Sequence, residues 1–275
     1  MYLGYNTNGL AHHKLEDALE IIRRNAFSAV GITIDHGVLE PNNVYTPHQI
    51  EFLQEYQAKY QFKYVIETGA RFLLNPFVKH EPTLVSPLEE ERRRRLDFYK
   101  YAVDSAAAIN AQCVSIWSGI CRRNESKCVI MNQFARDLIP LLDYAQQKGV
   151  SIAFEPEPGM FIGNLRDFSS LLERLNGDSR LNLTLDVGHL VCNQEPIEAS
   201  IIDWKDRLIN VHLEDMHVGI HEHLPFGTGE VNFTETFQAL KKISYSYGVY
   251  VELSRDSHRA VEAVESAAEF LQKFR

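Results

Sequence analysis

The chain has 275 residues, of which 45% are hydrophobic and 24% are charged, and its formal net charge at pH 7 is −9. An acidic protein lacks the basic surface that binds nucleic acid by displacing counterions, so no nucleic-acid partner is expected. No apolar run approaches the roughly 20 residues of a membrane helix, and the first residues lack the basic and apolar regions of a secretory signal. Four cysteines without C-x-x-C spacing complete the prediction of a cytoplasmic protein with reduced thiols and no membrane association.

Short β-branched or apolar runs alternate with longer helical patterns along the chain. Two S/T-P sequences that resemble capping boxes predict helix starts at Thr46 and Ser86, and Gly149 predicts a helix end. A last helix is expected to begin near Ser257. Eight strands are predicted, at Tyr2–Asn6, Ala29–Ile34, Lys63–Glu67, Cys113–Trp117, Ser151–Glu155, Leu183–Asp186, Ile209–Leu213 and Val249–Leu253.

Strands separated by helices indicate parallel pairing through right-handed crossovers. Eight such units in a chain of about the usual length predict an α/β fold, a closed (β/α)₈ TIM barrel, as a single domain over residues 1–275. An open doubly wound sheet is the alternative, but no G-x-G-x-x-G sequence follows any predicted strand. The longest stretch without periodicity, residues 71–86, follows the third strand. We expect this loop to lie over the mouth of the barrel and to be functional.

The last four predicted strands each deliver a metal-binding residue at or near the C-terminal end. The runs SIAFE, LTLD, INVH and VYVE contribute Glu155, Asp186, His212 and Glu252. The C-terminal ends of barrel strands meet at one face, where active sites lie. Three carboxylates and one imidazole suit Mn²⁺, Zn²⁺, Co²⁺ or Mg²⁺. Each residue alone is more often a helix cap, an ion-pair partner or a core histidine, but four in succession favour a metal site.

Glu155, the run Asp186–His189, the run His212–Asp215 and Glu252 resemble, in this order, the signature of the xylose-isomerase-like TIM barrels. That superfamily contains sugar phosphate isomerases and epimerases, dehydratases, and the AP endonuclease family 2, to which endonuclease IV belongs. The resemblance implies that the four residues share one metal. It also implies that Glu155 and Glu252 are the catalytic acid/base pair, and that His189 faces the substrate or a second metal.

The resemblance further implies a metal-dependent isomerase or epimerase that acts on a small sugar or sugar phosphate. The metal would polarise the substrate carbonyl and stabilise an enediolate, while the two glutamates move the proton. A dehydratase of the same superfamily and an endonuclease IV-like phosphodiesterase are the alternatives. A non-catalytic barrel ranks last because the ligand set is intact. The expected partner is a carbohydrate-like small molecule, and a homo-oligomer is left open.

A second metal is the other open question. The segment that begins with His221 and His223 is similar to the D-x-H segment of the endonuclease branch, with His221 in place of the aspartate. Together with His189, these residues would supply three imidazoles to a second ion, and a histidine-rich surface loop is the equal alternative. The third and fourth strands end without the histidines of the endonuclease branch. The arginine and the second glutamate of the ketose-epimerase branch are also absent.

Several side chains near predicted strand ends are candidates for substrate binding. Trp117 would stack on a sugar face or belong to the barrel core. Arg255 and His258 lie where the last helix opens, a place where this fold often binds phosphate. Capping of that helix by Asp256 or Ser257 is the equal alternative. The candidate substrate-binding residues are His36, Arg71, Trp117, His189, Arg255 and His258.

Overall fold

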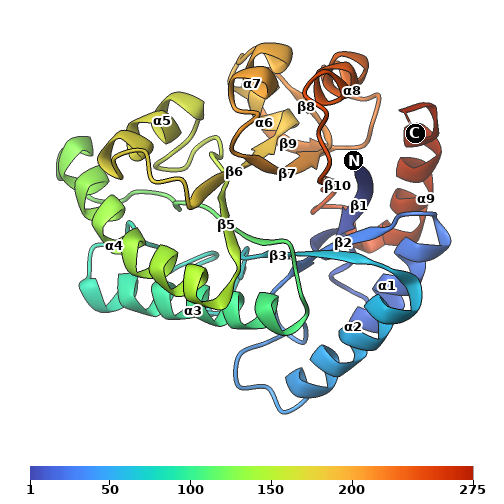
Figure 1. Ribbon diagram of the computed structural model, residues 1–275, viewed down its shortest axis with the longest axis horizontal. Coiled ribbons are helices and arrows are strands. Elements are labelled where there is room, and N and C mark those ends of the chain that lie inside the picture. The colour runs from blue at the N-terminus through green and yellow to red at the C-terminus, as the bar shows by residue number, and fades with distance from the viewer. Residues whose placement is uncertain (275) are drawn as a thin grey trace. The chain divides into compact units, whose positions relative to one another are not determined.

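The computed structural model describes residues 1–274. Eight parallel strands form a closed barrel in the order β1-β10-β7-β6-β5-β4-β3-β2 (Figure 1). This arrangement confirms the (β/α)₈ TIM barrel and rules out the open sheet. The barrel strands are β1 (Tyr2–Asn6), β2 (Ala29–Thr33), β3 (Lys63–Glu67), β4 (Cys113–Ile116), β5 (Ser151–Phe154), β6 (Leu181–Asp186), β7 (Leu208–Leu213) and β10 (Gly248–Val251).

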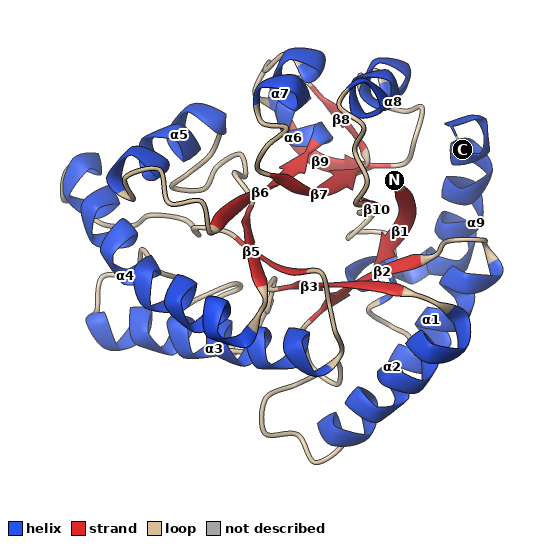
Figure 2. Cartoon of the chain, viewed as in Figure 1, coloured by secondary structure: helices blue, strands red, loops and turns tan. Residues whose placement is uncertain are grey.

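Helices and strands alternate along the chain (Figure 2). Between β7 and the next helix the chain adds a two-stranded antiparallel hairpin of β8 (Asp215–His217) and β9 (Ile220–Leu224). Among the described residues, no helix has both the length and the apolar character needed to cross a bilayer. The α-helices are α1 (Leu15–Arg24), α2 (Thr46–Tyr60), α3 (Glu89–Ala108), α4 (Lys127–Lys148), α5 (Leu165–Arg174), α6 (Val187–Cys192), α7 (Ile197–Asp203), α8 (Phe233–Lys242) and α9 (Ala260–Leu271).

The predicted strands lie within two residues of the observed ones, and α2 begins at Thr46 as predicted, whereas the predicted helix start at Ser86 is wrong. The Thr46 hydroxyl donates to the carbonyl of Glu40. Helix α3 begins at Glu89, and the Ser86 hydroxyl accepts instead from the backbone N–H of Thr83. The preceding loops therefore use both hydroxyls. Gly149 does end α4, with a φ of 70°.

The chain divides into two compact units, and the predicted single domain stays a prediction. The first unit comprises residues 1–32, 55–64 and the described chain from Leu183 onward. In this unit β1 pairs with β10, β10 with β7, and β7 with β6, all parallel. The register places Asp186 beside His212 and Val251 beside Leu213. The C-terminal ends of β6, β7 and β10 therefore lie at nearly the same level in the sheet.

The second unit comprises residues 33–54 and 65–182 and contains β3, β4 and β5. The long loop between β3 and α3 is held by Arg95, which is fully buried. Its guanidinium donates to the backbone carbonyls of Pro82 and Thr68, at 2.7 and 3.3 Å, and to that of His80. Because a buried cation needs such acceptors, Arg95 fixes the path of this loop.

Candidate metal centre

Three of the four predicted metal ligands lie together in the first unit. Asp186 is the last residue of β6, His212 lies on β7, and Glu252 directly follows β10. Asp186 and His212 are buried, with exposed fractions of 2% and 1%. The Nδ1 atom of His212 lies 2.8 Å from Oε2 of Glu252. Buried carboxylates and imidazoles in such contact require either shared protons or a cation.

Asp186 has two roles in the structure. Its Oδ1 atom accepts a hydrogen bond from the backbone N–H of His189 at 2.9 Å, which caps the first turn of α6. Its Oδ2 atom has no hydrogen-bond partner among the described residues. The D-x-x-H spacing thus fixes the carboxylate through one oxygen and leaves the other available to a cation.

Glu252 is held from two sides. The side-chain amide of Asn8 donates to its Oε1 atom at 2.7 Å, and the imidazole of His212 contacts Oε2. Burial opposes ionisation of this carboxylate, but the neighbouring His212 holds its pKa below the ordinary value. On the other side of its ring, His212 lies 3.2 Å from the amide nitrogen of Asn210. Both side chains are therefore oriented before any ligand binds.

Glu155, the fourth predicted ligand, belongs to the second unit. It directly follows β5, is buried, and its backbone N–H donates to the carbonyl of Ile116 at 2.8 Å. This is the strand-end position that the sequence predicted. Its participation in one ligand set with Asp186, His212 and Glu252 stays a prediction.

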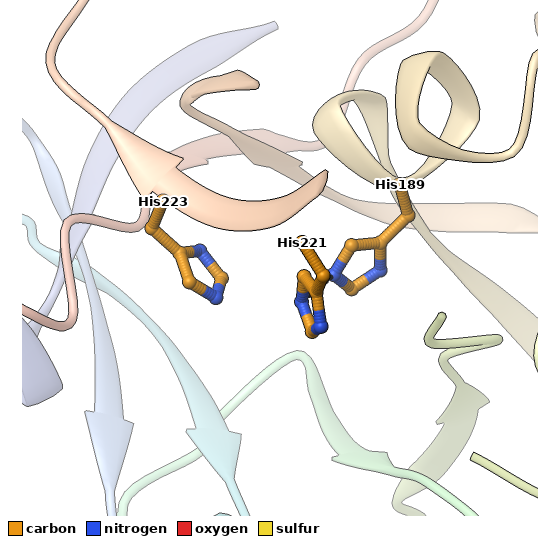
Figure 3. A group of neighbouring side chains, drawn as sticks. All are labelled: His189, His221 and His223. Atoms are coloured by element: carbon orange, nitrogen blue, oxygen red, sulfur yellow. Dashed lines mark hydrogen bonds between the residues drawn. The ribbon is translucent and has the colours of Figure 1, made fainter. Parts of the chain in front are cut away.

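The three predicted second-site histidines converge (Figure 3). His189 comes from α6, and His221 and His223 come from β9, with ring centroids 4.8 to 6.2 Å apart. The Nε2 atoms of His189 and His221 are 3.1 Å apart, so that one ring donates to the other. Burial and the two neighbouring imidazoles lower the pKa of His221 to about 4. Neutral rings of this kind are competent metal ligands, but the second ion itself stays a prediction.

The β8–β9 hairpin that carries two of these histidines was not predicted from the sequence. The signal was present in the alternating run Ile220–Leu224, whose period of two places His221 and His223 on one face. Gly219, with a φ of 71°, turns the chain between the two strands. The Asp215 carboxylate then accepts from the backbone N–H groups of Gly227 and Val231, which fixes the following glycine-rich turn.

Glu214 is a buried residue to which the sequence analysis gave no role. It follows β7 two positions after His212 and has an exposed fraction of 0%. Within the described chain neither of its carboxylate oxygens has a partner at ordinary hydrogen-bond geometry, and its carboxyl group interacts with that of Asp186. Burial and the adjacent Asp186 raise the pKa of Glu214 well above its ordinary value. The period-two alternation along β7 was the available signal, because it places Glu214 on the same face as His212.

The predicted substrate-binding residues lie in both units. In the second unit His36 is exposed near Glu40, Arg71 donates to Asp35, and Trp117 is buried. The last of these packs its ring edge-to-face against His80 at 5.3 Å. Their contact with a substrate stays a prediction.

In the first unit Arg255 and His258 are exposed. Arg255 donates to the carboxylate of Glu222 and to the carbonyl of His221, which links the loop after β10 to the β8–β9 hairpin. Neither Asp256 nor Ser257 caps the following helical turn, and the Ser257 hydroxyl donates to the carbonyl of Asn8. The capping alternative for this segment is therefore wrong, whereas phosphate or carboxylate binding by Arg255 and His258 stays a prediction.

The late strands of this (β/α)₈ barrel end in carboxylate and imidazole groups. The protein therefore belongs to the class of (β/α)₈ barrels that carry polar groups at the C-terminal ends of their strands. The family model described as xylose isomerase-like TIM barrel matches residues 19–274, and the chain belongs to this family. The family relationship predicted from the sequence is thereby confirmed.

Two relatives illustrate the range of similarity in sequence. An uncharacterised protein of Methanocaldococcus jannaschii is 26% identical over 99% of this chain and 90% of its own length. The L-ribulose-5-phosphate 3-epimerase UlaE of Shigella flexneri is 21% identical over 69% of this chain and 66% of its own length.

Solved structures share the fold over the whole chain. The IOLI protein, whose crystal structure contains a zinc atom, is 19% identical with a TM-score of 0.81, over 100% of this chain and 98% of its own. The D-allulose 3-epimerase of Methylomonas sp., solved in complex with D-allulose, is 17% identical with a TM-score of 0.76, over 100% of this chain and 97% of its own.

Proposed function

We propose that this protein is a divalent-metal-dependent epimerase or isomerase of small sugars or sugar phosphates. The observation that carries the proposal is the set of Asp186 and His212, which are buried, and Glu252, which is largely buried, at adjoining strand ends. Epimerases of ketoses and of L-ribulose 5-phosphate among the similar proteins support an enzyme of this class. These relatives also make a carbohydrate the best-supported kind of substrate.

The residues present fit a divalent metal. The Oδ2 atom of Asp186 accepts no hydrogen bond from the described residues and lies 3.6 Å from Nε2 of His189, and carboxylate and imidazole ligands suit Mn²⁺, Co²⁺, Zn²⁺ or Mg²⁺. We assign Asp186, His212, Glu252 and, from the end of β5, Glu155 as the ligands. Bound there, the metal would polarise a substrate carbonyl and stabilise negative charge on its oxygen.

Glu155 and Glu252 are assigned as the proton-transfer pair. One carboxylate removes the proton from the carbon next to the carbonyl, and the electron pair of the broken C–H bond moves toward the carbonyl oxygen to give an enediolate. The other glutamic acid returns a proton to the opposite face of that carbon, which inverts it, or to the neighbouring carbon, which isomerises the sugar. The hydrogen bond from Asn8 keeps Glu252 oriented for this step.

Substrate contacts are assigned to residues of both units. His189, a buried and neutral imidazole beside Asp186, is placed to contact a substrate hydroxyl. Arg255 and His258, on the exposed loop after β10, would contact a phosphate or carboxylate end of the substrate. In the second unit, Trp117, Arg71 and His36 would contact the sugar.

A panel of ketoses and ketose phosphates tests this function. The protein supplied with Mn²⁺ is expected to epimerise or isomerise at least one member, to lose that activity with a chelator, and to regain it on addition of metal. Product identity is followed by NMR. A dehydrated product would assign the reaction to the dehydratase alternative.

The convergence of His189, His221 and His223 is the observation that favours the second candidate, a metal-dependent phosphodiesterase. Cleavage of a duplex with an abasic site, together with no turnover of any sugar, would contradict the epimerase proposal.

A further inference from the structure

His80 is a histidine of the long loop between β3 and α3 that the proposed mechanism does not use. Its Nδ1 atom lies 2.7 Å from the carbonyl oxygen of Gly69, two residues after the end of β3. The ring also packs against Trp117, which directly follows β4, with the two centroids 5.3 Å apart. Strands β3 and β4 are paired, so both rings lie at the carboxyl ends of neighbouring strands. This is the end at which (β/α)₈ enzymes hold their substrates.

The contact with Gly69 fixes which nitrogen of His80 carries the proton. A carbonyl oxygen only accepts hydrogen bonds, so Nδ1 is the donor, and the neutral ring leaves Nε2 as an acceptor. Burial lowers the pKa of His80 to about 4, and the ring is therefore neutral at pH 7. No described residue makes a hydrogen bond to Nε2. His80 thus presents a single lone pair in a fixed direction.

Trp117 offers the complementary group, a donor. Its indole N–H has no hydrogen-bond partner among the described residues. The guanidinium of Arg95 lies over the ring, 5.3 Å from its centroid, and the exposed fraction of the whole residue is 7%. Neither Nε2 of His80 nor the indole nitrogen is among the enclosed, unpartnered polar atoms of the described chain, so both reach the surface. A ligand can therefore meet the N–H of Trp117 more readily than a face of its ring.

Two buried side chains hold the backbone of this pair in place. Arg95 donates to the carbonyl of His80, and the hydroxyl of Tyr99 donates to the carbonyl of Trp117 at 2.9 Å. The exposed fractions of Arg95 and Tyr99 are 0% and 1%. An acceptor and a donor that are fixed before a ligand arrives lose little freedom when it binds. Packing of the two rings accounts for the position of the loop but gives neither nitrogen a partner within the protein.

We infer that Nε2 of His80 and the indole N–H of Trp117 together bind a hydroxyl group of the substrate, which makes His80 a specificity-determining residue. A hydroxyl both donates and accepts, so its proton faces Nε2 and its oxygen accepts from the indole. The inference rests on the proposed function, which supplies the sugar. A site built to bond a hydroxyl rejects an analogue that lacks it, because the protein groups are then left unpaired.

His80→Asn tests the inference, because the new side-chain amide can still donate to Gly69 but has no group at the position of Nε2. For the ketose that the metal-loaded protein turns over, the variant is expected to raise KM about tenfold and to keep kcat within about threefold, as the loss of one binding hydrogen bond does. His48→Asn is the control and keeps the native KM, because it makes the same change on the exposed side of α2.

Monodeoxy analogues of that ketose identify the contact. For one analogue the kcat/KM values of His80→Asn and of the native protein should agree within about twofold, because the hydroxyl that His80 binds is already absent. The other analogues should keep the tenfold difference. A histidine that only packs the loop would change kcat/KM for all analogues alike, or for none. Either of these results overturns the inference while the proposed function stands.

Trp117→Phe removes the indole N–H and keeps an aromatic ring. It is expected to lower kcat/KM for the ketose about tenfold and to match the native protein on the same analogue as His80→Asn. Should His80→Asn fail to fold, this variant decides, because agreement with the native protein on no analogue overturns the pair. No turnover of any ketose overturns the proposed function, and the inference falls with it.

Discussion

Replacing Glu252 with glutamine is expected to lower kcat for sugar epimerisation by about 10³-fold or more. General acid–base catalysis by one positioned group contributes 10²- to 10⁴-fold, and this residue is also an assigned metal ligand. The amide keeps the hydrogen bond from Asn8 only as a weaker, uncharged one, and it cannot accept the proton. The measurement is kcat at saturating metal for the native protein and the variant.

Glu155→Gln is the paired test, and its kcat is expected to be lower than that of the native protein by a similar factor. A two-base mechanism requires both groups, so either variant alone should stop net inversion. Glu262→Gln should keep the native kcat because that residue is exposed on α9. If Glu252→Gln stays within tenfold of native kcat at saturating metal, Glu252 is not a proton-transfer residue.

Replacing His212 with alanine is expected to weaken binding of the first metal by at least about 100-fold. Mutation of a residue that only supports a metal ligand typically lowers metal affinity by 10- to 100-fold, and His212 is assigned as a ligand itself. The native protein should gain about 2.7 kcal/mol of unfolding free energy when free metal reaches 100 times its Kd, and a chelator should remove this gain. The variant at the same metal concentration should gain less than about 0.5 kcal/mol.

Chemical denaturation of both proteins, with and without metal, measures how much metal raises the free energy of unfolding. His217→Ala is the matched control, because His217 lies on the neighbouring β8 and its imidazole pairs with the exposed Glu230. Equal metal stabilisation in native protein and His212→Ala would remove His212 from the ligand set.

The sequence allowed prediction of the barrel and of the strand-end positions of the candidate metal ligands. Each strand is a short, mainly apolar run, and the late strands carry a carboxylate or an imidazole at or near the end where parallel strands meet. Asp186 shows why this prediction succeeds: β6 delivers the carboxylate and the same side chain caps α6, so that the local sequence determines both. Glu252 follows the same rule directly after β10.

Other features depend on contacts between distant segments and could not be predicted from local patterns. The hydroxyl of Ser86 bonds to the preceding loop, and α3 begins at Glu89 instead of near Ser86. The burial of Glu214 depends on the space left by Gly188, 26 positions earlier in the sequence. The β8–β9 hairpin was missed because two strands of five residues or fewer resemble a turn-rich loop.

Turnover of the sugar substrate in D₂O tests the central claim most directly. In the proposed mechanism, the metal-loaded protein would remove a proton from the carbon next to the carbonyl and return one from a carboxyl group that exchanges with solvent. NMR of the product should therefore show deuterium at the inverted or newly protonated carbon, and Glu252→Gln should show no turnover. A product formed at the native rate without solvent deuterium would contradict proton transfer by Glu155 and Glu252.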